Sequence, residues 1–231
     1  SPEIDSGQYH FKILDYFLPE FNGVEKLSTT GSMGQSLTKF KFLFNNPDKP
    51  PKQAYSEVLH GLLNLDSSYI LFLRNISKIE YILPDTRVGS IEYREDQSHH
   101  LVIKCVNPVE KSVEESHWLR FQQLVEIKDD KGILKKLPIA VAYLLESDSK
   151  AVKYRIVPIA GGGQTFIYFP AEKEVSNLRF HINAPFASTV ARDSVRDCIE
   201  NEDLMHSVAK LVADSFLEIK QMGLLDLSFL A

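Results

Sequence analysis

The chain has 231 residues and a mass of 26.3 kDa, which fits one large domain or two small ones. Its composition, with 44% hydrophobic and 25% charged residues, is typical of a globular protein and excludes a disordered chain. Because 26 Lys and Arg stand against 31 Asp and Glu, the chain lacks the surplus of cations that a dedicated nucleic-acid binder needs. No window approaches the roughly 18 apolar residues of a membrane helix.

The start of the chain and its cysteines predict a cytoplasmic segment of a longer protein. Residues 1–7 show no charged-then-apolar signal, and this opening looks like an internal cut. Cys105 and Cys198 are too far apart to form a zinc motif or a disulfide framework. We therefore expect a reducing, cytoplasmic location and no metal site.

The N-terminal part is predicted to contain a loop followed by a strand. A small, polar loop carries Gly31 and Gly34. Paired glycines can let a backbone approach a phosphate, but a simple flexible turn is the more economical interpretation. In residues 37–44, Thr38 and three phenylalanines occupy every second position and two lysines lie between them. This period of two predicts a half-buried strand, with Thr38 on the same face as the phenylalanines. Prolines within 45–51 then break the chain, and we expect a boundary between lobes there.

The next part is predicted to form a helix and then a meandering sheet. Apolar residues at helical spacing, among them Val58 and Leu62, predict a helix over 53–65. Short β-rich runs separated by turns follow, and their close spacing favours a largely antiparallel sheet. These runs are residues 69–73, 78–83, 90–93, 100–105, 117–127, 137–145, 154–159 and 165–169.

A helix over 202–222 is the most strongly patterned element. Asn201 can cap its start, and acidic residues follow in the first turn, where they suit the helix dipole. Gly223 is well placed to end the helix in a left-handed cap. The expected fold class is α+β, with a mixed, largely antiparallel sheet packed against helices. The helix should pack on the sheet through Leu204, Val208, Leu211 and Ile219.

The common catalytic motifs are missing from the sequence. It contains no H-E-x-x-H, no G-x-S-x-G and no Walker-A pattern. His99 and His100 are neighbours on a strand-like run, so their side chains should point to opposite faces rather than share a metal ion. Residues 161–163 are all glycine, but they precede a predicted strand and no Lys-Ser/Thr follows them, so we expect a flexible hairpin loop.

An arginine at a loop-to-helix junction is a candidate for contact with an anion. Residues 179–197 start as a strand, pass through a loop of small residues and reach Arg192 before a predicted helix. Ser194 with Asp197 resembles a capping box and places a helix start near Ser194. Arg192 could reach an anion across a cleft, or it could pair with Asp193 or Asp197, which is the commoner arrangement on protein surfaces.

Several segments resemble sacsin-like proteins. These proteins carry a Bergerat-type ATPase lobe, related to that of the ninety-kilodalton heat-shock chaperone, followed by a middle-type domain. The resemblance implies that residues 1–46 are the remnant of the end of the ATPase lobe, or a linker, and that residues 47–231 are a middle-type domain. The segments that carry it are TFIYFP at 165–170, LRFHINAPF at 178–186, the pair Arg192-Asp193, NEDL at 201–204 and, earlier in the chain, 31–40 and 69–75.

The resemblance also implies roles for particular residues. In the chaperone family an Arg on a middle-domain loop approaches the γ-phosphate of ATP, and Arg192 is its counterpart here. Because the loop looks longer than the chaperone's, Arg196 is an alternative. Gly31, Gly34 and Thr38 would lie on the nucleotide side, in the lid loop and the last strand of the ATPase lobe. The Glu, Asn and Asp-x-Gly-x-Gly of that lobe are missing upstream, so ATP and Mg²⁺ are expected only through a separate nucleotide lobe.

The function implied is that of a coupling segment in a sacsin-like, chaperone-type ATPase. It would supply a phosphate-sensing Arg and a client or partner surface, and the chain alone should have no activity. The expected partners are the adjacent ATPase lobe and protein clients or partner proteins, with a homodimer as an option, and with neither nucleic acid nor a membrane. The alternative is a non-catalytic scaffold or oligomerisation module of a large multidomain protein.

Overall fold

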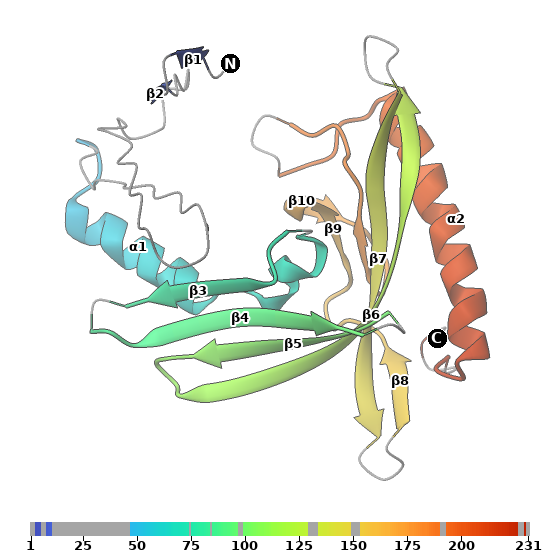
Figure 1. Cartoon of the computed structure of the whole chain (residues 1–231), viewed down its shortest axis with the longest axis horizontal. Coiled ribbons are helices and arrows are strands. Elements are labelled where there is room, and N and C mark those ends of the chain that lie inside the picture. Colours follow the sequence, from blue (N-terminus) through green and yellow to red (C-terminus); the bar gives the residue numbers. More distant parts are fainter. Residues whose placement is uncertain are drawn as a thin grey trace. The chain divides into compact units, whose positions relative to one another are not determined.

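Figure 1 shows the computed structural model of the chain. It describes residues 3–5, 8–10, 47–73, 75–83, 85–96, 99–128, 134–148, 153–189, 193–225 and 229. The chain divides into two compact units, Ser1–Asn64 and Leu65–Ala231. The predicted domains 1–46 and 47–231 stay a prediction. Among the described helices, none combines the length and the apolar character that crossing a bilayer requires.

The described residues of the first unit form a pair of short strands and one helix. β1 (Glu3–Asp5) and β2 (Gln8–His10) pair antiparallel. α1 spans Pro51–Leu63 and starts with a proline, whose fixed φ suits the first helical position. The helix predicted at 53–65 is therefore confirmed. The strand predicted at 37–44 lies outside the described residues.

The second unit is built on a nine-stranded sheet. Its strand order is β10-β9-β11-β7-β6-β5-β4-β3, and β8 pairs with β7 beside this path. All these pairs are antiparallel except the parallel pair of β11 and β9. The predicted α+β class with a mixed, largely antiparallel sheet is confirmed. The strands are β3 (Lys78–Ile82), β4 (Val88–Glu95), β5 (His100–Asn107), β6 (Ser112–Lys128), β7 (Leu134–Asp148), β8 (Lys153–Val157), β9 (Gln164–Ile167), β10 (Phe169–Val175) and β11 (His181–Asn183).

Two long strands join the two halves of this sheet. β6 pairs with β5 along its first part and with β7 along its second part, where the pairing runs from His117–Leu145 to Lys128–Leu134. In Figure 1 the direction of the strands turns by a large angle between β4 and β7. Side chains alternate between the two faces of a strand, so Leu119 and Phe121 lie on one face of β6, whereas Trp118 and Arg120 lie on the other.

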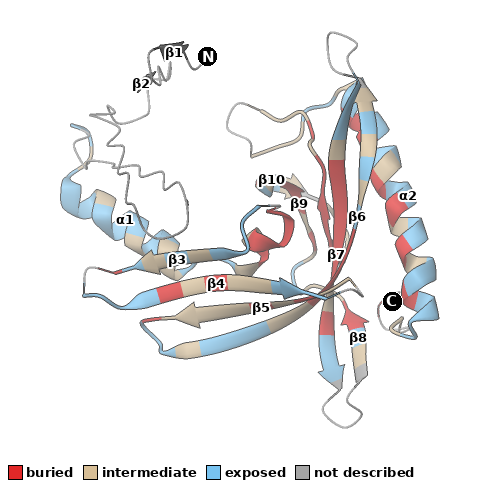
Figure 2. Ribbon diagram, in the orientation of Figure 1, coloured by how far each residue is buried: buried red, intermediate tan, exposed pale blue. Residues whose placement is uncertain are grey.

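One face of the sheet is covered by the helix α2 (Ile199–Gln221). Figure 2 shows buried residues along β7 and along one side of α2. We call this cluster the helix core, and it includes Leu119, Phe121, Val141 and Tyr143 from the sheet. The predicted packing of the C-terminal helix on the sheet is confirmed. The helix contributes Leu204, Val208, Leu211 and Ile219, which are all buried.

Truncation of Leu211 to Ala should lower the free energy of unfolding by about 2–5 kcal/mol, because it leaves a cavity in the helix core. Leu217 lies on the same helix but is 63% exposed, so Leu217→Ala should change stability by no more than about 0.5 kcal/mol. Urea denaturation of both variants measures the difference. A loss of less than about 0.5 kcal/mol for Leu211→Ala would place this side chain outside the core.

The other face of the sheet holds a second cluster around a short 3-10 helix, η1 (Ser67–Phe72). We call it the η1 core, and it joins Ile70, Leu71 and Phe72 to Trp118 and other sheet residues. The strand predicted at 69–73 is therefore wrong. Asp66 initiates the helical turn because its Oδ1 accepts a hydrogen bond from the Ser68 N–H at 2.7 Å. The following apolar residues are buried around the turn rather than on one face of a strand.

The structure confirms the predicted end of α2 but not its predicted start. The helix begins at Ile199 with Cys198 at the N-cap position, so a start near Ser194 and a cap at Asn201 are both wrong. Its end agrees with the prediction, because Gly223 has a φ of 68°. The Gly223 N–H donates to Lys220 O and the Leu224 N–H donates to Ile219 O, which is the hydrogen-bond pattern of a Schellman cap.

The glycines at 161–163 form a tight turn, but not the predicted hairpin. β8 pairs with β7, whereas β9 pairs with β10 and β11, so this turn connects strands that are not neighbours. Gly161 and Gly162 have φ values of 81° and 92°, which L residues rarely adopt. Tyr168 also has a positive φ, of 68°, and it separates β9 from β10 within the run predicted as one strand.

Candidate functional site

The structure places two polar features in the second unit that bear on function. One is the loop of residues 184–198 before α2, which contains Arg192. The other is a polar cavity on the η1 side of the sheet, which we call the Arg120 pocket. Gly31, Gly34, Thr38 and Arg192 all lie outside the described residues, so the candidate site is built from the residues around them.

A buried asparagine ties the 184–198 loop to α2. Asn201 is 4% exposed and lies in the first turn of the helix. Its Oδ1 accepts a hydrogen bond from the Ala187 N–H at 2.8 Å, and its Nδ2 donates to Ala187 O at 2.9 Å and to Arg196 O at 2.6 Å. One side chain therefore holds both limbs of the loop against the start of the helix.

The limbs of the loop are also joined to each other. Ser188 and Val195 form an isolated antiparallel bridge, and the Thr189 N–H donates to Ser194 O at 3.1 Å. These bonds bring together the described residues on either side of 190–192. The described residues 187–189 and 193–196 thus form a hydrogen-bonded base on either side of Arg192 in the sequence.

On its other side the loop contacts β10. The Lys173 N–H donates to Asp193 O at 2.8 Å, and the Val195 N–H donates to Glu174 Oε1 at 2.6 Å. Lys173 Nζ contacts Asp193 Oδ2 at 2.5 Å, and Thr189 Oγ1 donates to Asp193 Oδ1 at 2.8 Å. Hydrogen bonds from Lys173, and then from Thr189, lower the pKa of Asp193. The carboxylate next to Arg192 in sequence therefore already has two donors.

Arg196, the alternative to Arg192, is exposed beside a groove of about 590 Å³. Carboxylates of Glu174, Asp197 and Glu202 line the same groove. Because like charges repel, three acids beside one Arg make this groove a poor place for a phosphate. The groove beside Arg196 therefore does not favour a phosphate contact at this residue.

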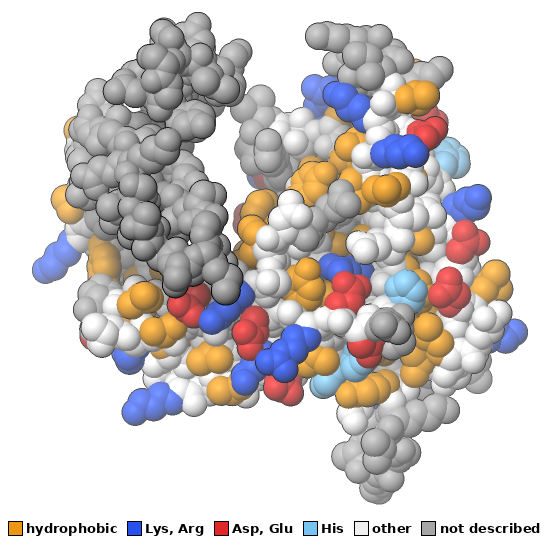
Figure 3. Space-filling model, in the orientation of Figure 1, with side chains coloured by type: hydrophobic (Ala, Val, Ile, Leu, Met, Phe, Trp, Pro, Cys, Tyr) orange, Lys and Arg blue, Asp and Glu red, His pale blue; other side chains and the backbone are white. Residues whose placement is uncertain are grey.

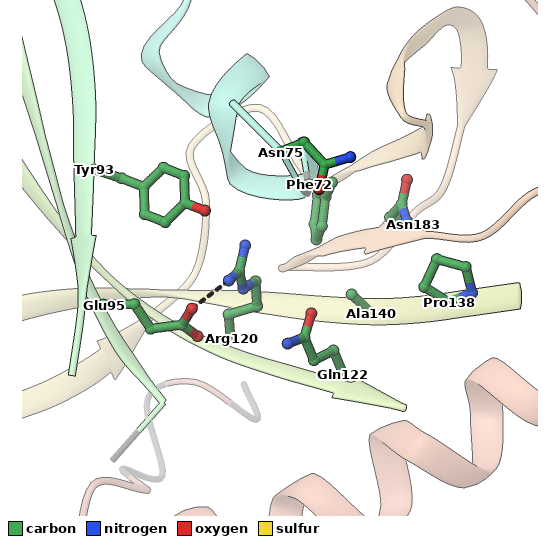
Figure 4. Close-up of a pocket in the computed structure, with 9 residues that line it drawn as sticks. All are labelled: Phe72, Asn75, Tyr93, Glu95, Arg120, Gln122, Pro138, Ala140 and Asn183. Carbon is green, nitrogen blue, oxygen red and sulfur yellow. Dashed lines mark hydrogen bonds and ion pairs between the residues drawn. The ribbon is translucent and has the colours of Figure 1, made fainter. Parts of the chain in front are cut away.

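The Arg120 pocket is a polar cavity of about 260 Å³ on the opposite side of the sheet from α2 (Figure 4). Arg120 is 5% exposed and points into it from β6. Its Nη1 donates to Leu71 O at 2.5 Å, its Nη2 donates to Glu95 Oε2 at 2.5 Å, and its Cζ lies 5.5 Å from the centroid of the Tyr93 ring. The full lining is Phe72, Asn75, Tyr93, Glu95, Arg120, Gln122, Pro138, Ala140 and Asn183.

Local sequence makes room for the buried guanidinium. Arg120 pairs with Ala142 across the β6–β7 ladder, and Gln122 pairs with Ala140. Small side chains at these positions of β7 leave space on the face where Arg120 and Gln122 lie. Our sequence reasoning missed this site, although an Arg within an apolar strand, opposite Ala-x-Ala, is a signal that could have drawn attention to it.

A buried histidine lies beside this pocket on β11. His181 Nδ1 accepts a hydrogen bond from the Gln164 N–H at 2.9 Å, and its ring packs against Trp118 and Phe166. Burial lowers the pKa of His181 to about 4, because it disfavours the charged imidazolium. His181 is therefore neutral at pH 7 and adds no charge near the pocket.

His99 and His100 do not come together in the structure. His99 packs on Phe121, whereas the His100 ring stacks on His117, with 3.1 Å between His100 Nε2 and His117 Nδ1. Burial, and then the neighbouring His100, lowers the pKa of His117. Within the described ranges no group of three or more His, Cys, Asp or Glu side chains could hold a metal ion.

The surface shows no dominant charge on the side drawn in Figure 3, where cationic and anionic side chains of the described residues are interspersed. Comparisons of the chain with protein-family models, with curated proteins and with solved structures found no match.

Proposed function

We propose that the chain is the coupling segment of a sacsin-like, chaperone-type ATPase. In this role the 184–198 loop presents Arg192 to the terminal phosphate of ATP held by a separate nucleotide lobe, which also binds Mg²⁺. The observation that supports the proposal is the hydrogen-bonded base of this loop. Asn201 bonds to Ala187 and Arg196, the Thr189 N–H donates to Ser194 O, and the Val195 N–H donates to Glu174 Oε1, so the described residues on both sides of Arg192 in the sequence are held in place.

A fixed base of this kind suits a phosphate-sensing residue. Stabilisation of a transferring phosphoryl group depends on cations that are already in position when charge develops. An Arg is suited to the task because its planar fork can donate two parallel hydrogen bonds to phosphate oxygens, which Lys cannot do.

The same base offers a route for coupling. Asn201 belongs both to the anchoring of the loop and to the first turn of α2, and α2 packs along the sheet through the helix core. A displacement of the loop on phosphate binding or release would therefore move the start of a helix that is about 35 Å long, at 1.5 Å per residue for 23 residues. The rest of the segment would present the client or partner surface.

The substitution Arg192→Ala in the full-length protein tests the proposal. ATP turnover should fall on the order of 100-fold or more, because a contact to the transferring phosphoryl group is lost. Arg192→Lys should restore little of it, and Arg196→Ala should leave turnover within about threefold of the unmodified protein. Stability of the chain should change by no more than about 0.5 kcal/mol, as for an ordinary surface site.

The isolated chain provides the control. Because the residues that hold the nucleotide belong to another lobe, calorimetric titration with Mg-ATP should give no saturable heat. Unchanged turnover in Arg192→Ala, together with a clear loss of stability, would overturn the coupling role and favour the scaffold alternative. A single saturable ATP site on the isolated chain would also contradict it.

A further inference from the structure

One face of the β3–β6 half of the sheet carries no buried side chain. The strand registers place on this face the even-numbered residues of β3, β4 and β5 and the odd-numbered residues 113–117 of β6, and every one of them is half-buried or exposed. The opposite face of the same strands forms part of the η1 core. In the second unit α2 packs on β6 and β7 and lies away from β3, β4 and β5 (Figure 1). We call the face without buried residues the open face.

The open face carries more aliphatic side chains than a solvated sheet face needs. An antiparallel sheet that faces water on one side ordinarily places polar residues there. Here Ile82, Val88 and Val113 are 68%, 44% and 58% exposed, and Val102 and Val106 lie half-buried on β5. Ile82 pairs with Val88, and Val106 pairs with Val113, so these side chains lie next to one another. Apolar groups gathered in this way favour contact with another protein surface.

A row of alternating charges crosses the same face. Glu92 of β4 pairs with Lys78 of β3 on one side and with Lys104 of β5 on the other. Lys104 in turn pairs with Glu115 of β6, so the signs along the row are plus, minus, plus, minus. Lys78 contacts Glu80 at 2.6 Å. Among the ion pairs of the described residues none includes the other three members of the row, so the two central charges are available to a partner.

A row with this order of charges is complementary to a second copy of itself. Two identical surfaces that contact each other are related by a two-fold axis. An axis that lies between the two faces, runs parallel to the strands and passes between β4 and β5 reverses the strand order in the second copy. Glu92 then lies opposite Lys104 of the second copy, and Lys104 lies opposite Glu92 of that copy. An axis across the strands would instead place each charge opposite its own kind, which is unfavourable.

We propose that the open face is the interface of a homodimer, in which two half-sheets pack face to face about this axis and pair Glu92 with Lys104 twice. The face is four strands wide and five residues long, which is about 19 Å by 17 Å at about 4.8 Å per strand and about 3.3 Å per residue. Because an interface of this size is at the small end of specific protein contacts, we expect a Kd of about 1–100 µM. The proposal does not depend on Arg192 or on ATP.

Sedimentation velocity of the chain at low salt, from about 1 µM to about 500 µM, tests whether this dimer forms. The sedimentation coefficient should rise with concentration from that of a monomer to that of a dimer, because association at this affinity is reversible. A chain that remains monomeric at about 500 µM would overturn the proposal.

Charge reversal tests the axis itself. Lys104→Glu places like charges opposite each other at both central contacts, and so does Glu92→Lys, so each variant alone should raise the Kd at least about tenfold. An equimolar mixture of the two variants should form a heterodimer with a Kd within about threefold of the unmodified chain, because every position of the row is again opposite its counter-charge. Lys210→Glu is the matched control, since it makes the same change in net charge at an exposed position of α2, and its Kd should be unchanged.

Circular dichroism establishes that each variant is folded before its association is measured. Val113→Glu is a second route to the same surface, because it places a charge in the aliphatic part of the open face at a position that is 58% exposed. It should raise the Kd at least about tenfold, and it decides if a charge-reversal variant does not fold. A folded Lys104→Glu that dimerises as the unmodified chain does, or a mixture without rescue, would show that any dimer uses another surface, and the proposal would be wrong. None of these variants alters the loop before α2, so the outcome is independent of the test of Arg192.

Discussion

Replacement of Asn201 by Ala should lower the free energy of unfolding by about 3–5 kcal/mol. The Asn201 side chain is buried and bonds to three backbone groups of the loop, which are Ala187 N, Ala187 O and Arg196 O. Each buried polar group that loses its partner costs about 1–3 kcal/mol, although relaxation and water recover part of this. The loss should therefore exceed that of most single substitutions.

Urea denaturation and amide hydrogen exchange measure the effect of Asn201→Ala. Exchange should accelerate at Ala187, whose N–H loses its acceptor, more than at residues of β6 and β7. Lys210→Ala is the control, because Lys210 is an exposed residue of α2. The free energy of unfolding of this variant should stay within about 0.5 kcal/mol of the unmodified chain. If Asn201→Ala lost less than about 1 kcal/mol, the loop would not depend on this anchor, and the argument for a fixed Arg192 would lose its support.

Gly163→Ala should be more damaging still, with a loss of more than about 4 kcal/mol or a failure to fold. A Cβ at this position would lie 1.8 Å from Phe180 O and 2.4 Å from Phe180 C. Both are backbone atoms and cannot turn away as a flexible side chain would. The close approach is fixed by the Gly163 N–H, which donates to Leu178 O at 2.6 Å, and Phe180 belongs to the helix core.

Gly161→Ala provides the matched control in the same turn. A Cβ on Gly161 meets nothing within 4 Å, and its φ is 81°, so the substitution should cost only the conformational strain of about 1–2 kcal/mol. Thermal unfolding followed by circular dichroism, with urea titration of the soluble variants, measures both. Equal stability of the two variants would show that the steric overlap at Gly163 is relieved by a small shift of the turn.

Much of the sheet could be predicted from the sequence because local chemistry decides it. Strands β3 to β7 have short-range alternation or β-rich composition and are separated by turns, which is why their existence was predicted correctly even where their ends were not. The end of α2 is also local, since Gly223 can adopt a positive φ without strain. These elements need little information from distant parts of the chain.

The errors occur where distant contacts decide the structure. Residues 69–73 have the apolar run of a buried strand, and only their burial among sheet residues and the cap at Asp66 distinguish a 3-10 turn. Asn201 has a side chain that suits an N-cap, but it bonds instead to Ala187, fourteen positions earlier in the chain. Ser194 likewise lies in the bridged loop rather than at the start of a helix.

The candidate sites were even less accessible to sequence reasoning. The partners of Arg120 are Leu71 and Glu95, which lie 49 and 25 positions away. No motif spacing links them, because the η1 turn and the end of β4 meet β6 only when the sheet has formed. Arg192 could be selected from its position before a helix and from the sacsin-like segments, but the anchoring of its loop through Asn201 could not.

The alternation of side chains along β6 and β7 has a consequence for how this protein can misfold. Each strand contributes to the helix core with one set of residues and to the η1 side with the intervening set. A slip of the β6–β7 pairing by one residue would turn Arg120 toward α2 and would move Phe121 into the polar pocket. Such a slip leaves a buried charge without its partners and places a large aromatic ring against polar groups at the same time. Side chains on both faces of the sheet therefore disfavour the shifted register. The buried Arg120 contributes to this because the shift would separate it from its partners.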